Sequence, residues 1–352
     1  MPIKFRPVMM AGFILLLGVG GFFLTSGGQV YSESEPPPLS AITAAAPPSP
    51  TVTLAAVGDV MCHMPQVRAA WDEMRQVYDF RPAFAAVKPH LSAADITVAN
   101  LETILDDSRP YRGYPRFNSP AALAKALQDA GVNIVITANN HALDQGERGV
   151  LSTLANLKDA GLLAIGTYAQ EEDRAPLILT VKGFKLAFLA YTTTTNGLPL
   201  PKGKDYLVNL WQAEQAAADI AAARAEGAEF VVVSLHFGQE YQRQPSKEQE
   251  EVVQQLVTAG ADLILGSHPH VVQPIVEIEK PSGDGRVLVA YSLGNFISNQ
   301  KDPYTDQGLI LYATLRRHPL TGRVGLASYW ELPTRVLRGK EIKVVPADIT
   351  ES

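Results

Sequence analysis

Cysteine is almost absent from this chain. The 352 residues include one cysteine, Cys62, which excludes an intramolecular disulfide and any zinc site built from several cysteines. A basic surplus is also missing, because 30 lysines and arginines stand against 36 aspartates and glutamates, giving a net charge of -6. We therefore expect no nucleic-acid partner, since nucleic-acid binders normally present a basic face. No internal repeat is found along the chain.

Hydrophobic residues are plentiful by contrast. They make up 46% of the chain and charged residues 19%, so a sizeable core can be buried in one large domain or two ordinary ones. The seven histidines are the more informative count, because at least four of them stand at the ends of apolar runs. Of the others, His90 and His318 are interpreted as surface residues, and Cys62 as a small buried residue.

The N-terminus predicts a membrane anchor. Residues 1–6 contain two basic residues, and residues 7–25 carry no charge and are long enough to cross a bilayer as a helix. We expect a single-pass protein of the cell membrane, with 1–6 in the cytoplasm, a transmembrane signal-anchor in the lipid bilayer over 7–25, and the remainder extracytoplasmic. Cleavage near Thr25–Gly28 is the alternative. The Pro-, Ser- and Ala-rich residues 26–50 predict an extended linker before a folded domain over 51–345.

Apolar β-branched runs alternate with helical segments through the predicted domain. Strands are expected at 51–57, 95–99, 132–137, 229–235 and 261–265, and a hairpin over 176–191. Helices are expected near 120–130, 147–160, 211–226 and 246–259, several of them closed by glycine, and residues 66–91 are expected to be irregularly helical. This order predicts an α/β sandwich of mixed β-sheets flanked by helices.

Polar side chains cluster where the apolar strands stop. Five strand ends have this character: Asp59, Asn100–Glu102, Asn140–His141, His236 and His268–His270. Ligands of open α/β sheets bind at the carboxyl ends of the strands, so these side chains should meet.

Mixed oxygen and nitrogen donors suit divalent Mn, Fe or Zn. Two such ions would need a bridging carboxylate, and together they would activate a water and clamp an ester. If the chain stays extended through His268-Pro269-His270, both rings project the same way and each can face a different ion. Each strand end alone also has a purely structural interpretation, as a turn residue or a core histidine.

Six stretches in order resemble the bacterial capsule synthesis family, the CapA-type proteins linked to poly-γ-glutamate capsules. The family is similar in fold to calcineurin-like metallophosphoesterases. The matching stretches span most of the mature chain and are Ala56–Val60, Ala99–Glu102, Ala138–Gly146, Leu235–Glu240, Gly266–Val271 and Tyr291–Phe296.

The resemblance implies a role for each matching residue. One ion would be held by Asp59 and His270, and the other by Asn140, His236 and His268, with Glu102 as the bridging carboxylate. Asp59 and His141 would form the catalytic pair, His141 acting near the leaving group as general acid or oxyanion stabiliser. Substrate contacts would come from Asn100 and Asn295.

The sequence also departs from the phosphoesterase pattern. The first phosphoesterase motif is typically Asp-x-His, and this chain has Met61 at the histidine position. The usual Gly-Asp-x-x-Asp motif is replaced by Asn100-Leu101-Glu102. Three possibilities follow: one ion has fewer protein ligands, is completed by His63, or is missing.

Three functions remain open at this stage. The resemblance favours a membrane-anchored component of poly-γ-glutamate capsule biosynthesis with a metal-dependent hydrolase-like site. Its partners would be poly-γ-glutamate or another anionic polymer and membrane-bound capsule synthesis subunits. The alternatives are a secreted metal-dependent phosphoesterase and a non-catalytic scaffold subunit. Five loop cations could face an anionic polymer, although solvated charges are the preferred interpretation: Arg109, Arg112, Arg116, Lys202 and Lys204.

Overall fold

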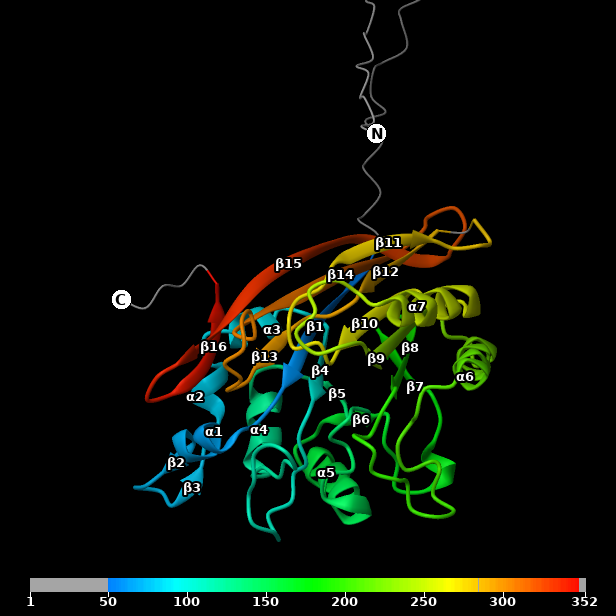
Figure 1. The fold of residues 1–352 in the computed structure, drawn as a ribbon. Coiled ribbons are helices and arrows are strands. Elements are labelled where there is room, and N and C mark those ends of the chain that lie inside the picture. Colours follow the sequence, from blue (N-terminus) through cyan, green and yellow to red (C-terminus); the bar gives the residue numbers. More distant parts are fainter. Residues whose placement is uncertain (1–49, 284, 348–352) are drawn as a thin grey trace, which may run out of the picture. The chain divides into compact units, whose positions relative to one another are not determined.

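Two β-sheets packed face to face form the centre of the described chain (Figure 1). This computed structural model describes residues 50–283 and 285–347. The predicted transmembrane segment 7–25 and all but the last residue of the predicted linker lie outside this part. Among the described helices, none has the length and apolar character needed to cross a membrane.

The first sheet has the strand order β16-β15-β14-β1-β4-β5-β6, with β13 paired to β1. Its four strands β1, β4, β5 and β6 are parallel, and the β14–β16 side is antiparallel. The bounds are β1 Thr51–Val60, β4 Ile96–Leu101, β5 Ile134–Ile136, β6 Leu163–Ile165, β13 Asn295–Ile297, β14 Gln307–Arg317, β15 Val324–Arg338 and β16 Ile342–Pro346.

The second sheet has the order β11-β12-β10-β9-β8-β7. Its four central strands are parallel, and β7 and β11 close the two edges in antiparallel pairing. The bounds are β7 Leu177–Val181, β8 Phe184–Thr192, β9 Phe230–His236, β10 Leu263–Ser267, β11 Ile275–Glu279 and β12 Arg286–Ala290.

Helices cover the outer faces of both sheets. Helices α1 to α5 pack on the first sheet, and α6 and α7 pack on the second (Figure 1). The bounds are α1 Met64–Ala69, α2 Arg81–Phe84, α3 Lys88–Leu91, α4 Ala122–Asp129, α5 Gly146–Asp159, α6 Ala213–Ala225 and α7 Lys247–Ala259, with a 3-10 turn η1 at Glu171–Asp173. The predicted α/β sandwich of mixed sheets flanked by helices is confirmed.

Side-chain alternation along the strands builds these layers. In β1, Val52, Leu54 and Ala56 point into the core between the sheets, and Ala55 and Val57 point toward the helices. Successive residues of a strand face opposite sides, and because both sides are covered the strand is apolar throughout. This is why the sequence shows continuous apolar runs instead of alternation.

One segment differs from its prediction. Residues 66–91 were expected to be irregularly helical, and part of this stretch forms a small hairpin of β2 (Trp71–Asp72) and β3 (Val77–Tyr78). The rings of Trp71 and Tyr78 contact each other across it, with centroids 5.0 Å apart and planes tilted by 59°, and Asp72 accepts two backbone N–H groups in the turn. Cross-strand aromatic contact and a local Asp turn outweigh the helical pattern here.

A bulge in β1 places the first polar residue of the site. Against β4, Val57 pairs with Ala99 and Asp59 with Asn100, so Gly58 is an extra residue. A bulge redirects the following side chain. A Cβ on Gly58 would lie 1.9 Å from the Gly294 carbonyl oxygen, so only glycine fits where the backbones of β1 and the loop before β13 touch.

We expect Gly58→Ala to destabilise the domain by about 1–3 kcal/mol, because the methyl group collides with backbone that cannot rotate away. Urea unfolding of the variant measures this. Gly325→Ala in β15 is the matched control, since a Cβ there meets nothing within 4 Å, and it should leave the midpoint unchanged. Equal stability of the two variants would contradict the close approach.

Candidate metal centre

The five polar strand ends do meet, and they meet around Glu102. This residue follows β4 of the first sheet and is fully buried. Its Oε1 atom lies 3.7 Å from His270 Nε2, 3.8 Å from His236 Nε2 and 3.9 Å from His141 Nε2. Two of these histidines come from the second sheet, so the site closes only when the sheets pack.

Neither carboxylate oxygen of Glu102 has a hydrogen-bond partner. Burial, followed by the Asp59 charge, raises the pKa of Glu102 well above its usual range. Two donors that share one ion at about 2.1 Å each stand roughly 3.4 Å apart in a tetrahedral arrangement. The three imidazole distances are slightly longer than this and too long for hydrogen bonds. An unpaired buried carboxylate facing imidazoles at this separation fits a divalent cation.

On one side of Glu102 lie His236, Asn140 and His268. His236 Nε2 is 3.0 Å from Asn140 Oδ1, and His236 Nδ1 is 3.0 Å from the Ser267 hydroxyl. Ser267 can donate its proton to the Leu235 carbonyl and accept from Nδ1–H. In that arrangement Nε2 and Oδ1 face each other as two acceptors, which again favours a cation between them.

His268 belongs to the same side. Its ring lies 4.8 Å from that of His236, and its buried Nδ1 has no hydrogen-bond partner. Burial, followed by neighbouring imidazoles, lowers the pKa of His236 well below the usual value and that of His268 to about 4. Both rings are therefore neutral near pH 7, which is the form that binds metal.

On the other side lie Asp59 and His270. Asp59 Oδ2 is 3.0 Å from His270 Nδ1, and Asp59 Oδ1 accepts from Asn100 Nδ2 at 2.8 Å. Asn139 in turn donates to Asn100 Oδ1 at 3.4 Å. Asn100, expected to contact substrate, is thus used to orient Asp59, and Asp59 in turn orients His270.

His141 is held with Nε2 toward Glu102. Its Nδ1 lies 2.7 Å from Asp144 Oδ2, and Asp144 also accepts the Phe117 backbone N–H at 2.6 Å. The Phe117 ring and the imidazole form a T-shaped contact at a centroid distance of 4.7 Å. Asp144, three residues beyond His141 in the matching stretch, was not singled out from the sequence.

Asn295 begins β13 beside Asp59, and its substrate contact stays a prediction. Its side chain is fully buried and donates to Gln300 Oε1 at 2.8 Å and to the Thr305 carbonyl at 2.9 Å. These bonds close the loop that follows β13. The residue pairs with Asp59 through the backbone of β1 and β13, and its Oδ1 has no hydrogen-bond partner.

The chain does not stay extended through His268-Pro269-His270. Strand β10 ends at Ser267, and both histidines have positive φ, 98° at His268 and 58° at His270. Such conformations cost of order 1–3 kcal/mol each at non-glycine residues and concentrate at functional sites. The two rings still lie together, 6.0 Å apart, but a turn brings them there and not strand geometry.

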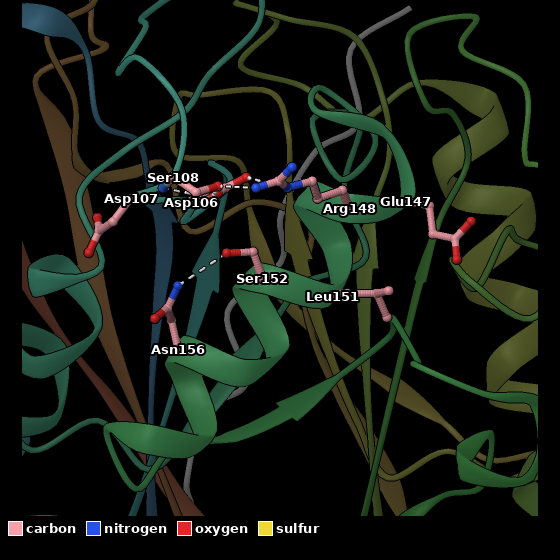
Figure 2. Close-up of a pocket in the computed structure, with 8 residues that line it drawn as sticks. All are labelled: Asp106, Asp107, Ser108, Glu147, Arg148, Leu151, Ser152 and Asn156. Atoms are coloured by element: carbon pink, nitrogen blue, oxygen red, sulfur yellow. Dashed lines mark hydrogen bonds and ion pairs between the residues drawn. The ribbon is translucent and has the colours of Figure 1, made fainter.

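An open cavity of about 680 Å³ lies elsewhere, along α5 (Figure 2). Its polar groups pair with one another: Arg148 donates to Ser108 at 2.6 Å and lies 3.7 Å from Asp106, and Asn156 donates to Ser152 at 3.3 Å. No predicted site residue lines it. Asp106 Oδ2 has no hydrogen bond but lies 3.7 Å from the guanidinium groups of Arg109 and Arg148, whereas both oxygens of Glu102 lack a hydrogen bond and face imidazoles, so the candidate chemistry is assigned to Glu102.

The described chain contains three groups of residues that could hold a metal ion, and within each group the potential ligand atoms lie within 4.8 Å of one another. Asp59, Glu102 and His270 form one set, and Glu102, His236 and His268 form another. Both contain Glu102, as a bridging carboxylate would. The third set joins His268 and His270 to Glu240, a residue that the sequence prediction did not use although it ends the matching stretch Leu235–Glu240.

The fold and this cluster define a class: a metallophosphoesterase-like α/β sandwich with a histidine and carboxylate centre at the strand ends. Residues 53–300 match the family described as "Bacterial capsule synthesis protein PGA_cap". The chain belongs to this family, as the sequence predicted.

Two curated relatives carry related descriptions. The "Capsule biosynthesis protein CapA" of Bacillus anthracis is 30% identical over 277 residues, covering 74% of this chain and 63% of the relative. The "PGA biosynthesis protein CapA" of Bacillus subtilis is 29% identical over 235 residues, covering 65% and 60%. The match therefore spans less than two thirds of either relative.

A solved structure shares the fold. The NAD nucleotidase NadN of Haemophilus influenzae aligns with 85% of this chain and 61% of its own at a TM-score of 0.51, with 13% sequence identity. At this identity the likeness concerns the fold alone.

We expect Glu102→Gln to weaken metal binding by at least 10- to 100-fold, because the only charged donor common to both ligand sets is lost. The metal-free variant should unfold within about 1 kcal/mol of the unsubstituted protein, because Gln replaces a carboxyl group without partners. Calorimetric metal titration and thermal unfolding measure the two effects. Glu251→Gln, at an exposed position of α7, is the control. Unchanged metal affinity in Glu102→Gln would contradict the assignment.

Proposed function

We propose that this protein is a membrane-anchored, extracytoplasmic component of poly-γ-glutamate capsule biosynthesis, and that it acts through a metal-dependent hydrolase-like site. The observation that carries the metal-dependent part is the buried Glu102 carboxylate, which has no partner and faces three imidazoles at 3.7–3.9 Å. Family membership and the names of the two CapA relatives support the capsule pathway.

The ligands would divide as the resemblance implies. Asp59 and His270 would hold one ion, and Asn140, His236 and His268 the other. Glu102 lies within ligand distance of both sets. Divalent ions of this kind supply Lewis-acid polarisation of a carbonyl or phosphoryl oxygen.

His141 would handle the proton. With Nδ1–H donated to Asp144, the lone pair of Nε2 faces the Glu102 cluster, where it can take up a proton from an attacking water and then pass that proton to a leaving group. The pair is buried, which keeps the imidazole orientation fixed and excludes bulk water. Asp144 acts through His141, as a positioning residue.

The predicted anchor over 7–25 and linker over 26–50 would tether the site outside the membrane. An uncharged run of bilayer length behind basic residues supports this orientation. A reporter fusion after residue 350 should be active outside the cytoplasm and stay with the membrane fraction. A soluble, released reporter would point to a cleaved signal instead.

The central experiment measures metal content and hydrolysis together. The purified protein should contain Mn, Fe or Zn, and Asp59→Ala and His268→Ala should reduce both metal content and capsule polymer in cells. Hydrolysis of a generic aryl phosphodiester that disappears in Asp59→Ala would favour a phosphoesterase acting outside the capsule pathway. A metal-free protein, together with normal capsule in His268→Ala cells, would leave only the scaffold function.

Asp144→Asn separates positioning from metal binding. We expect it to lower kcat by about 10²-fold or more, because Asn cannot fix the Nδ1–H tautomer of His141. Metal content should stay as in the unsubstituted protein, since Asp144 belongs to none of the ligand sets. Steady-state kinetics with metal analysis tests this, and a loss of metal equal to the loss of rate would refute the role.

A further inference from the structure

We propose that Glu240 is a metal ligand, which completes the coordination of the ion at His270. The role of Glu240 depends on the metal-dependent site proposed above. Glu240 is not part of the phosphoesterase ligand pattern. Glu240 as a ligand also answers the question that the altered first motif leaves open, namely what replaces the missing histidine at position 61.

Met61 does not supply the missing ligand. Its side chain is buried, and its sulfur contacts the Ser298 hydroxyl at 3.5 Å. A thioether is a soft donor and a poor substitute for imidazole at a site built from carboxylates and histidines. The ligand must come from another segment.

His63 is the candidate that the sequence suggests, and its contacts argue against it. It precedes α1, where its Nδ1 accepts the Asn299 N–H at 3.3 Å. Nδ1 also lies 3.3 Å from Gln66 Oε1, so this nitrogen is engaged within the protein and is not available to a metal. Its ring meets Phe117 edge-on at 5.1 Å, and His63 is in none of the ligand sets of the described chain.

Glu240 lies where a further ligand is needed. One of its carboxylate oxygens and one nitrogen each from His268 and His270 lie within 4.8 Å of one another. In the division proposed above, the ion at His270 has Asp59 and the shared Glu102 as its other protein donors, and His268 belongs to the other ion. A Glu240 oxygen would give the ion at His270 a further carboxylate donor, in a mixed nitrogen and oxygen set of the kind that borderline divalent ions prefer.

The fold holds Glu240 in this place by extending the pairing of β9 with β10. Beyond the strand ends, Phe237 N–H donates to the Ser267 carbonyl at 3.1 Å, and Tyr241 N–H donates to the Pro269 carbonyl at 2.9 Å. Glu240 is therefore carried along the segment that contains both histidines. Its position depends on backbone contacts and not on a free loop.

Two backbone conformations in this loop are specific. Gly238 has φ of 102°, and a Cβ there would lie 2.5 Å from the Gln249 side chain, so glycine is needed. Tyr241 has φ of 65° although it is not glycine. Positive φ at Tyr241 and at His268, on both sides of the Tyr241–Pro269 hydrogen bond, is the kind of strain that functional sites maintain.

Glu240 is exposed, whereas Glu102 is buried. The two carboxylates therefore approach the histidines from different sides, Glu102 from the interior and Glu240 from solvent. An ion bound by the exposed Glu240 would lie nearer to solvent, and we expect it to exchange faster than the ion held by Asn140 and His236.

The test uses the full chain, purified in detergent, with Mn²⁺ and Co²⁺ as probes. Metal content by mass spectrometry and affinity by calorimetric titration are measured for the unsubstituted protein, Glu240→Gln and Glu240→Ala. The alanine variant is needed because an amide oxygen can itself bind metal. Glu251→Gln is the acidic control, and His63→Ala tests the competing ligand. Circular dichroism verifies the fold of each variant.

We expect two ions in the unsubstituted protein, and in Glu240→Ala one of them bound at least about 10-fold more weakly, with the visible spectrum of the Co²⁺ form changed. Glu251→Gln and His63→Ala should bind both ions normally. Unaltered binding in Glu240→Ala, or the same loss in His63→Ala, overturns the assignment of Glu240 and leaves the metal site intact. A protein that binds no metal in any form overturns the proposed function as well.

Discussion

The carboxyl group of Glu102 has no hydrogen bond, although it is completely buried. Burying the charged form of a carboxyl group without a partner is costly, which is why burial raises the pKa of Glu102. Every element that reaches this group contributes a donor atom suited to a cation, and the sequence segments that provide them come from both sheets. A cation there would turn an unfavourable burial into the interaction that joins the two halves of the sandwich.

Close backbone contacts make this convergence possible. A Cβ at Gly58 or at Gly266 would lie 1.9 Å from a carbonyl oxygen of the loop between β12 and β13. The two glycines come from different sheets, and each immediately precedes a residue of the site region. The loop that they contact begins at Tyr291 and contains Gly294, so the family stretch Tyr291–Phe296 acts as a spacer between the sheets.

A second layer of contacts fixes the rings. Asp144 holds His141, Ser267 contacts His236, and Asp59 holds His270. Partners of this kind set the tautomer and the direction of a ligand, and their loss commonly weakens metal binding or activity. Only Asp59 was singled out from the sequence, because a partner that acts through another side chain has no spacing pattern of its own.

The α/β sandwich, the family and the polar strand ends follow from the sequence alone, because apolar periodicity and short motifs are local properties. The sequence did not determine the hairpin β2–β3, the turn through His268 and His270, or the inward fixing of Asn295. Those depend on contacts between residues far apart in the chain. The proximity of Glu240 to His268 and His270, and the contact of His63 with Asn299, likewise follow only from how β9, β10 and the loop after β13 pack together. Strand ends can be read along the chain, but which donors share one ion is decided by distances that only the packed sheets set.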